Sequence, residues 1–130
     1  MNRTALQDYF SIENFQEIIR DTAQDIEKSG IGYLMENKLA FAGVLHRCEI
    51  LGEIAKNLSD NFKQTVPDIP WNDIAKTRDI ITHHYHRVDP QIIKKILEEQ
   101  IPILTKILPK LRQTAFDKLD PDDQNDVVIK

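Results

Sequence analysis

The sequence predicts an all-α fold, an antiparallel bundle of four to five helices. Apolar residues recur at helical spacing through most of the 130-residue chain. No segment alternates apolar and polar residues for long enough to form a sheet. Helix-breaking residues are few and unevenly placed. The 4 Gly all lie between residues 30 and 52, and the 6 Pro all lie from residue 67 onward. We therefore expect long helices joined by short connections.

A first helix is expected from about Ile12 to Lys28. Its apolar positions follow a 3.6-residue period, and Ser11 stands ahead of them as an N-cap. The Ser-Gly-Ile-Gly stretch at 29–32 ends this helix, because two glycines in four residues disfavour helical backbone.

A long second helix is expected from Tyr33 to about Leu58, again from the apolar period. Gly43 and Gly52 inside it are weak helix formers, which suggests that another helix packs closely against them. Cys48 is the single cysteine, so no intramolecular disulfide is possible, and we expect it to be a small core residue.

The polar and proline-containing stretch 59–70 is expected to be a connection. A third helix begins near Trp71, which we expect to anchor the core at the helix start, and it ends near a cluster of three histidines at 83–86. Asp89 and Pro90 then supply an N-cap and a first-turn proline for a fourth helix.

The fourth helix carries a wide apolar face as far as Leu111, but two prolines interrupt it. Pro102 and Pro109 each remove a backbone donor and clash with the preceding turn, so a kink or break is expected near residue 102. After Phe116 the apolar period is lost. We therefore expect a helical domain over 1–116 and an acidic, disordered tail over 117–130.

The formal net charge of −4 comes largely from this tail. Residues 71–95 carry five basic and three acidic side chains, so the overall acidity does not exclude a partner that bears phosphates. No stretch approaches the about 18 apolar residues of a membrane span, and the first residues lack the apolar core of a secretory signal. We expect no membrane association and a cytoplasmic location.

The candidate catalytic residues lie in the segment 78–86, which contains an arginine, a carboxylate, three histidines and a tyrosine. His83 can take the proton of a ribose 2′-hydroxyl near neutral pH, and Arg78 can stabilise charge that develops on the attacked phosphate. A chain that leaves the helix near Thr82 can turn His83 back toward Arg78, and Tyr85 and Asp79 can support this pair. These groups suit RNA cleavage without a metal.

Other interpretations of these residues remain open from spacing alone. His83, His84 and His86 can be solvated residues at a helix C-terminus, or they can bind a transition metal with Asp79 or Asp89. Arg78 and Asp79 can form a simple surface ion pair. Glu49 and Glu53, one turn apart in the second helix, are expected to form a solvated or partner-facing stripe rather than paired catalytic carboxylates.

A family resemblance narrows these alternatives. The pattern Arg78-x4-His83-x-Tyr85 matches the signature of HEPN-domain toxins of the HepT type. Three further blocks resemble that family, at 49–59, 69–74 and 88–93. The resemblance implies the HEPN fold and a homodimer in which two Arg/His/Tyr sets face one cleft that grips RNA.

The resemblance further implies the toxin of a type VII-like toxin–antitoxin system, an endoribonuclease that cleaves mRNA or tRNA and needs no cofactor. Arg78 and His83 would be the catalytic pair, with Asp79 and Tyr85 in support. Its antitoxin would be a minimal nucleotidyltransferase of the MntA type that neutralises the toxin by AMPylation of Tyr85. The alternative function is a non-catalytic helical module that serves as the substrate subunit of that nucleotidyltransferase.

Overall fold

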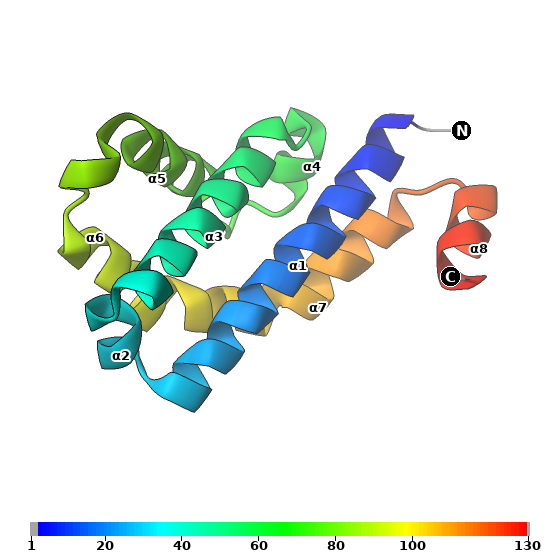
Figure 1. Ribbon diagram of the computed structural model, residues 1–130. Coiled ribbons are helices and arrows are strands. Elements are labelled where there is room, and N and C mark those ends of the chain that lie inside the picture. The colour runs from blue at the N-terminus through cyan, green and yellow to red at the C-terminus, as the bar shows by residue number, and fades with distance from the viewer. Residues whose placement is uncertain (1–2, 130) are drawn as a thin grey trace.

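The computed structural model describes residues 3–129, and these residues form helices and short connections without a strand (Figure 1). The helices are α1 (Arg3–Ser29), α2 (Ile31–Glu36), α3 (Lys38–Asn57), α4 (Asp60–Thr65), α5 (Trp71–His84), the 3₁₀ turn η1 (Tyr85–Arg87), α6 (Pro90–Lys95), the π turn η2 (Ile96–Gln100), α7 (Ile101–Asp117) and α8 (Pro121–Ile129). Within this part of the chain, no helix is long and apolar enough to cross a membrane.

Four long helices form the bundle and bury the core. α1 lies along α7, α3 lies along α5, and α1 also packs against α3 (Figure 1). The core contains side chains from all four of these helices, including the fully buried Phe15, Ile19, Ile81, Leu108 and Leu111. The all-α bundle is therefore confirmed, and the short helices add to the four or five that the periodicity predicts.

The first helix is longer than expected. α1 already includes Arg3, and Ser11 lies inside it rather than at its N-cap. The apolar stripe continues upstream through the buried residues Ala5 and Tyr9. The acidic Asp8 interrupts the apolar pattern, so the sequence does not show that the stripe continues. In the structure Asp8 is buried, and its carboxylate accepts hydrogen bonds from the backbone N–H and the hydroxyl of Ser59 at 3.0 and 2.6 Å.

The expected second helix is divided in two. Gly30, with a φ of 83°, separates α1 from α2, and Asn37 separates α2 from α3. Asn37 has extended backbone angles, and its side chain accepts a hydrogen bond from the backbone of Ala40 at 2.9 Å. This N-cap starts a new helix within an apolar period that continues across the break.

The expected connection at 59–70 contains helix α4. Ser59 caps α4 by accepting a hydrogen bond from the backbone of Phe62 at 3.2 Å, and Phe62 is fully buried. Trp71 anchors the start of α5 as expected, since it is buried and its indole N–H donates to the Val66 carbonyl at 3.1 Å. A helix as short as α4 shows no apolar period, which is why the sequence pattern does not reveal it.

The predicted break near residue 102 is confirmed as the π turn η2. The backbone N–H of Ile101 donates to the carbonyl of Ile96, five residues earlier, immediately before Pro102. Asp89 caps α6 as expected by accepting from the backbone of Gln91 at 2.9 Å. Pro109 does not end α7, which runs on to Asp117.

The expected disorder after Phe116 is wrong for most of the tail, because residues 121–129 form helix α8. Leu119 and Asp123 are buried, and Val127 packs against the core. The side chain of Gln124 donates to the carbonyls of Phe116 and Leu119 at 3.1 and 3.2 Å, which ties α8 to the end of α7. The boundary at residue 116 between a folding unit and a tail stays a prediction.

Candidate active site

The close packing of α3 against α5 positions the motif arginine. Gly52 on α3 is buried against α5, and a β-carbon at residue 52 would overlap the Cβ of Arg78 and lie 2.9 Å from the carbonyl oxygen of Ile74. The expected packing at Gly52 is thus confirmed. Gly43 is different, because it is exposed and a β-carbon there would have no neighbouring atom within 4 Å.

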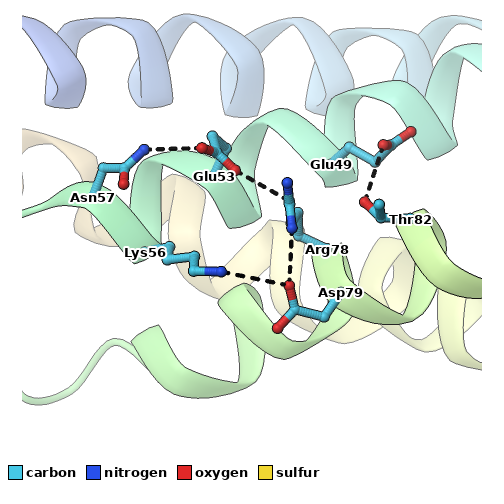
Figure 2. Close-up of polar contacts among 7 residues, drawn as sticks. All are labelled: Glu49, Glu53, Lys56, Asn57, Arg78, Asp79 and Thr82. Atoms are coloured by element: carbon cyan, nitrogen blue, oxygen red, sulfur yellow. Dashed lines mark hydrogen bonds and ion pairs between the residues drawn. The ribbon is translucent and has the colours of Figure 1, made fainter.

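Arg78 lies between two carboxylates on the surface that α3 and α5 form (Figure 2). Its Nε is 3.1 Å from Oε2 of Glu53, and its Nη1 is 3.1 Å from Oδ1 of Asp79. The Arg78 side chain is 27% exposed, so it remains partly open to solvent. The sequence predicted the contact with Asp79 but missed Glu53, an exposed residue of α3 that follows the buried Gly52.

The neighbouring polar side chains extend this ion pair into a network. Asn57 donates to the second carboxylate oxygen of Glu53 at 3.0 Å, and Lys56 Nζ lies 3.9 Å from the same Asp79 oxygen that Arg78 contacts. Glu49 accepts a weak hydrogen bond from the hydroxyl of Thr82 at 3.4 Å (Figure 2). Glu49 and Glu53 therefore each contact a polar side chain of α5, while the Glu53 side chain stays 50% exposed, as expected of a solvated stripe.

The histidines follow at the C-terminal end of α5. His83 and His84 occupy its last turn, and both are exposed. The expected helix end near the histidine cluster is confirmed, since α5 ends at His84, but the chain does not leave the helix at Thr82. Five residues on a continuous helix place Arg78 and His83 about 140° apart around the axis, so one chain does not turn them toward each other.

Tyr85 begins the 3₁₀ turn η1 and is 47% exposed. Its ring packs edge-on against that of His86, with 5.5 Å between the centroids. The phenol is accessible to a partner or to a modifying enzyme from the solvent side.

The geometry of the histidines bears on two of the alternatives. The side chains that the transition-metal alternative would need do not converge, since no three His, Cys, Asp or Glu side chains among residues 3–129 are grouped as a metal site. The last-turn position of His83 and His84 fits the favourable interaction of histidine with a helix C-terminus. That interaction is compatible with a chemical role, because it leaves both imidazoles exposed.

Cys48 is a core residue as expected and offers no nucleophile. It is buried beneath the α3–α5 interface, and burial raises the pKa of its thiol to about 12, with the neighbouring charge of Glu49 adding to the rise. A thiol that stays buried and protonated does not act as the nucleophile of a reaction at this surface.

The bundle is all-helical over the described residues, with Arg78 and His83 of the Arg-x4-His-x-Tyr motif on α5 and Tyr85 at the start of η1, and it has the architecture of a HEPN domain. The chain belongs to the family described as Ribonuclease HepT-like, which matches residues 11–111. The match covers the whole of the α3–α5 surface and both histidine positions of the last turn.

Individual relatives agree with this assignment. A protein from Thermococcus cleftensis named Probable ribonuclease HepT is 40% identical over 81 residues, which cover 62% of this chain and 73% of the relative. Two proteins from Methanocaldococcus jannaschii, both named as candidate RNases, are 28% and 31% identical over 75% and 72% of this chain and 86% and 74% of their own lengths. No solved structure matches significantly.

Proposed function

We propose that this protein is a metal-independent endoribonuclease toxin in which Arg78 and His83 are the catalytic pair. The observation that carries the proposal is the placement of Arg78 on an exposed surface of α5, fixed by Glu53 and Asp79, in a chain of the ribonuclease HepT-like family. The substrate would be cellular RNA, either mRNA or tRNA, in the cytoplasm.

The proposed reaction uses groups of the RNA and of the chain alone. His83 takes the proton of a ribose 2′-hydroxyl, and the resulting oxygen attacks the adjacent phosphorus. The bond from phosphorus to the 5′-oxygen breaks, and that oxygen takes up a proton, so the products carry a 2′,3′-cyclic phosphate and a 5′-hydroxyl. Arg78 pairs with the non-bridging oxygens, whose negative charge grows in the transition state.

A homodimer would complete this site. In one chain, Arg78 and His83 project from different sides of α5, so a phosphate gripped by one Arg78 is not faced by the His83 of the same chain. A second copy across a shared cleft would bring its own histidine to that phosphate. Arg87, Lys94 and Lys95 are exposed nearby in sequence and would add positive potential along the cleft.

Control of the toxin would act through Tyr85. We propose that a nucleotidyltransferase antitoxin of the MntA type transfers AMP from ATP to the exposed phenol. The added phosphate would compete with RNA by like charge and pair with Arg78, and the adenosine would block the cleft by bulk. The alternative is that the chain is only the substrate subunit of that enzyme and cleaves nothing.

The test incubates the purified protein with total RNA and with tRNA in the presence of EDTA. The Arg78→Ala and His83→Ala variants run beside the wild type. The proposal expects cleavage by wild type and a loss of at least about 100-fold in both variants, because each removes a group used in the transition state. Absence of wild-type cleavage, with AMP still transferred to the chain, would favour the substrate-subunit alternative.

A further inference from the structure

A single carboxylate oxygen on this surface is shared by two cations. Oδ1 of Asp79 lies 3.1 Å from Nη1 of Arg78 and 3.9 Å from Nζ of Lys56 (Figure 2). The two nitrogens are therefore at most 7.0 Å apart, although Arg78 comes from α5 and Lys56 from α3. The fold thus places the positive charges of Arg78 and Lys56 on either side of the negatively charged Asp79 carboxylate.

We propose that Lys56 is a second phosphate-binding residue of the RNA site, acting on the phosphate that Arg78 contacts. Asp79 Oδ1 marks where a non-bridging phosphate oxygen would lie once RNA displaces the carboxylate. A phosphate accepts hydrogen bonds at about 2.7–3.2 Å from several directions, so its oxygens can bridge the separation of these two nitrogens.

The exposure of the three side chains allows this exchange. The side chains of Lys56 and Asp79 are 55% and 46% exposed, so both can move without unpacking the core. Arg78 is fixed on its other side by Glu53, so its guanidinium stays in place when Asp79 gives way. Because a lysine is a flexible point charge, Lys56 can follow the phosphate through a change in its geometry.

Lys56 has a role that differs from that of Arg78. Arg78 is expected to act in the transition state, whereas a flexible, solvated lysine contributes chiefly to substrate binding. Removal of Lys56 should therefore raise KM and the Kd for RNA and change kcat little.

The experiment measures binding and cleavage separately, since the inference rests on the proposed function. Binding uses a labelled RNA that wild type cleaves, or labelled tRNA if none is cleaved, with all variants built on His83→Ala so that the RNA stays intact. Lys56→Ala is compared with Lys56→Arg and with Lys38→Ala. Lys38 is an exposed lysine at the other end of α3, about 27 Å away along the helix.

Lys56→Ala is expected to raise the Kd about three- to tenfold and to reduce the slope of log Kd against log salt by about 0.7. In the otherwise wild-type enzyme, KM should rise by a similar factor with kcat within about twofold. Lys56→Arg should restore binding to within about twofold, because it keeps the positive charge, and Lys38→Ala should leave binding unchanged.

Equal binding by the Lys56→Ala and Lys38→Ala variants would overturn the inference, and so would a fall in kcat at unchanged Kd. Thermal melting of each variant shows that the fold is intact. If wild type binds RNA with this dependence on Lys56 but cleaves none, the proposed catalysis fails while the phosphate site stands. If wild type cleaves and Lys56→Ala binds normally, only the inference fails.

Discussion

Gly52 and Arg78 are packed so closely that the absence of a side chain at residue 52 determines where the motif arginine lies. A β-carbon there would overlap that of Arg78 and approach the Ile74 carbonyl oxygen to 2.9 Å. The next residue along α3, Glu53, is thereby brought to 3.1 Å from Arg78 Nε. Helix packing and the polar network of the candidate site therefore depend on the same contact.

Gly52→Ala is predicted to destabilise the protein by about 1–3 kcal/mol, because α3 and α5 must move apart to admit the methyl group. Gly43→Ala is the matched control in the same helix. Nothing lies within 4 Å of its added carbon, so the change should stabilise α3 by about 0.5–1 kcal/mol. Urea unfolding of both variants measures the difference, and equal stability of the two would contradict the close contact.

Glu53→Ala is predicted to lower kcat for RNA cleavage by about tenfold, since Arg78 loses the group that holds its Nε. KM should not rise, because removal of a negative charge beside the site favours RNA. Glu53→Gln should recover part of kcat, as its amide oxygen can still accept from Arg78. Glu49→Ala is the control one turn away, and a loss of kcat as large as that of Glu53→Ala would argue against a specific role for Glu53.

The Cys48 thiol is predicted to resist alkylation and disulfide reagents in the native protein. Its pKa rises from 9.0 to about 12 through burial, so almost no thiolate forms at about pH 8. Reaction at that pH should be more than about tenfold slower in the native state than in urea. Fast native labelling would show that the α3–α5 interface opens readily.

The same shift gives a pH dependence of stability. Above pH 9 the unfolded thiol ionises while the folded thiol keeps its proton, so stability present below pH 9 is lost between pH 9 and 12. The urea midpoint should fall less steeply over this range in Cys48→Ala than in wild type. Identical slopes would contradict the raised pKa.

Tyr85 is predicted to be the only AMPylation site under co-expression with a nucleotidyltransferase antitoxin. Its 47% exposure leaves the phenol accessible at η1, whereas Tyr9 is buried. Intact mass should rise by one or more AMP units in wild type and by none in Tyr85→Phe. Tyr33→Phe is a control at the other exposed tyrosine and should be modified normally. Modified Tyr85→Phe protein would refute the assignment.

The sequence predicted the bundle because its long helices repeat apolar residues over many turns. It also predicted the break before Pro102 and the cap at Asp89, since proline and N-cap chemistry act locally. It missed α4 and α8, which are too short for a clear period. The sequence did not predict the break between α2 and α3 at Asn37, because the apolar pattern continues across it.

The sequence proposed the residues of the candidate site, but it did not predict most of the contacts that the structure gives them. Arg78, Asp79, His83 and Tyr85 follow from a motif within one helix and its end. The role of Glu53 depends on how α3 packs on α5, far along the chain, and a single sequence carries no direct signal for such a pairing. The position of His83 relative to Arg78 depended on where α5 ends, and helix ends are poorly determined by sequence.

The most direct test of the proposed reaction is the chemistry of the RNA ends left by the purified protein in EDTA. In-line attack by the 2′-oxygen, assisted by His83 and Arg78, predicts 5′-hydroxyl and 2′,3′-cyclic phosphate ends from wild type. The Arg78→Ala and His83→Ala variants should yield neither end above background, and a substrate with a 2′-deoxy sugar at the cleavage position should stay intact. Cleavage that leaves 5′-phosphate ends, or cleavage by the two variants equal to that of wild type, would contradict this mechanism.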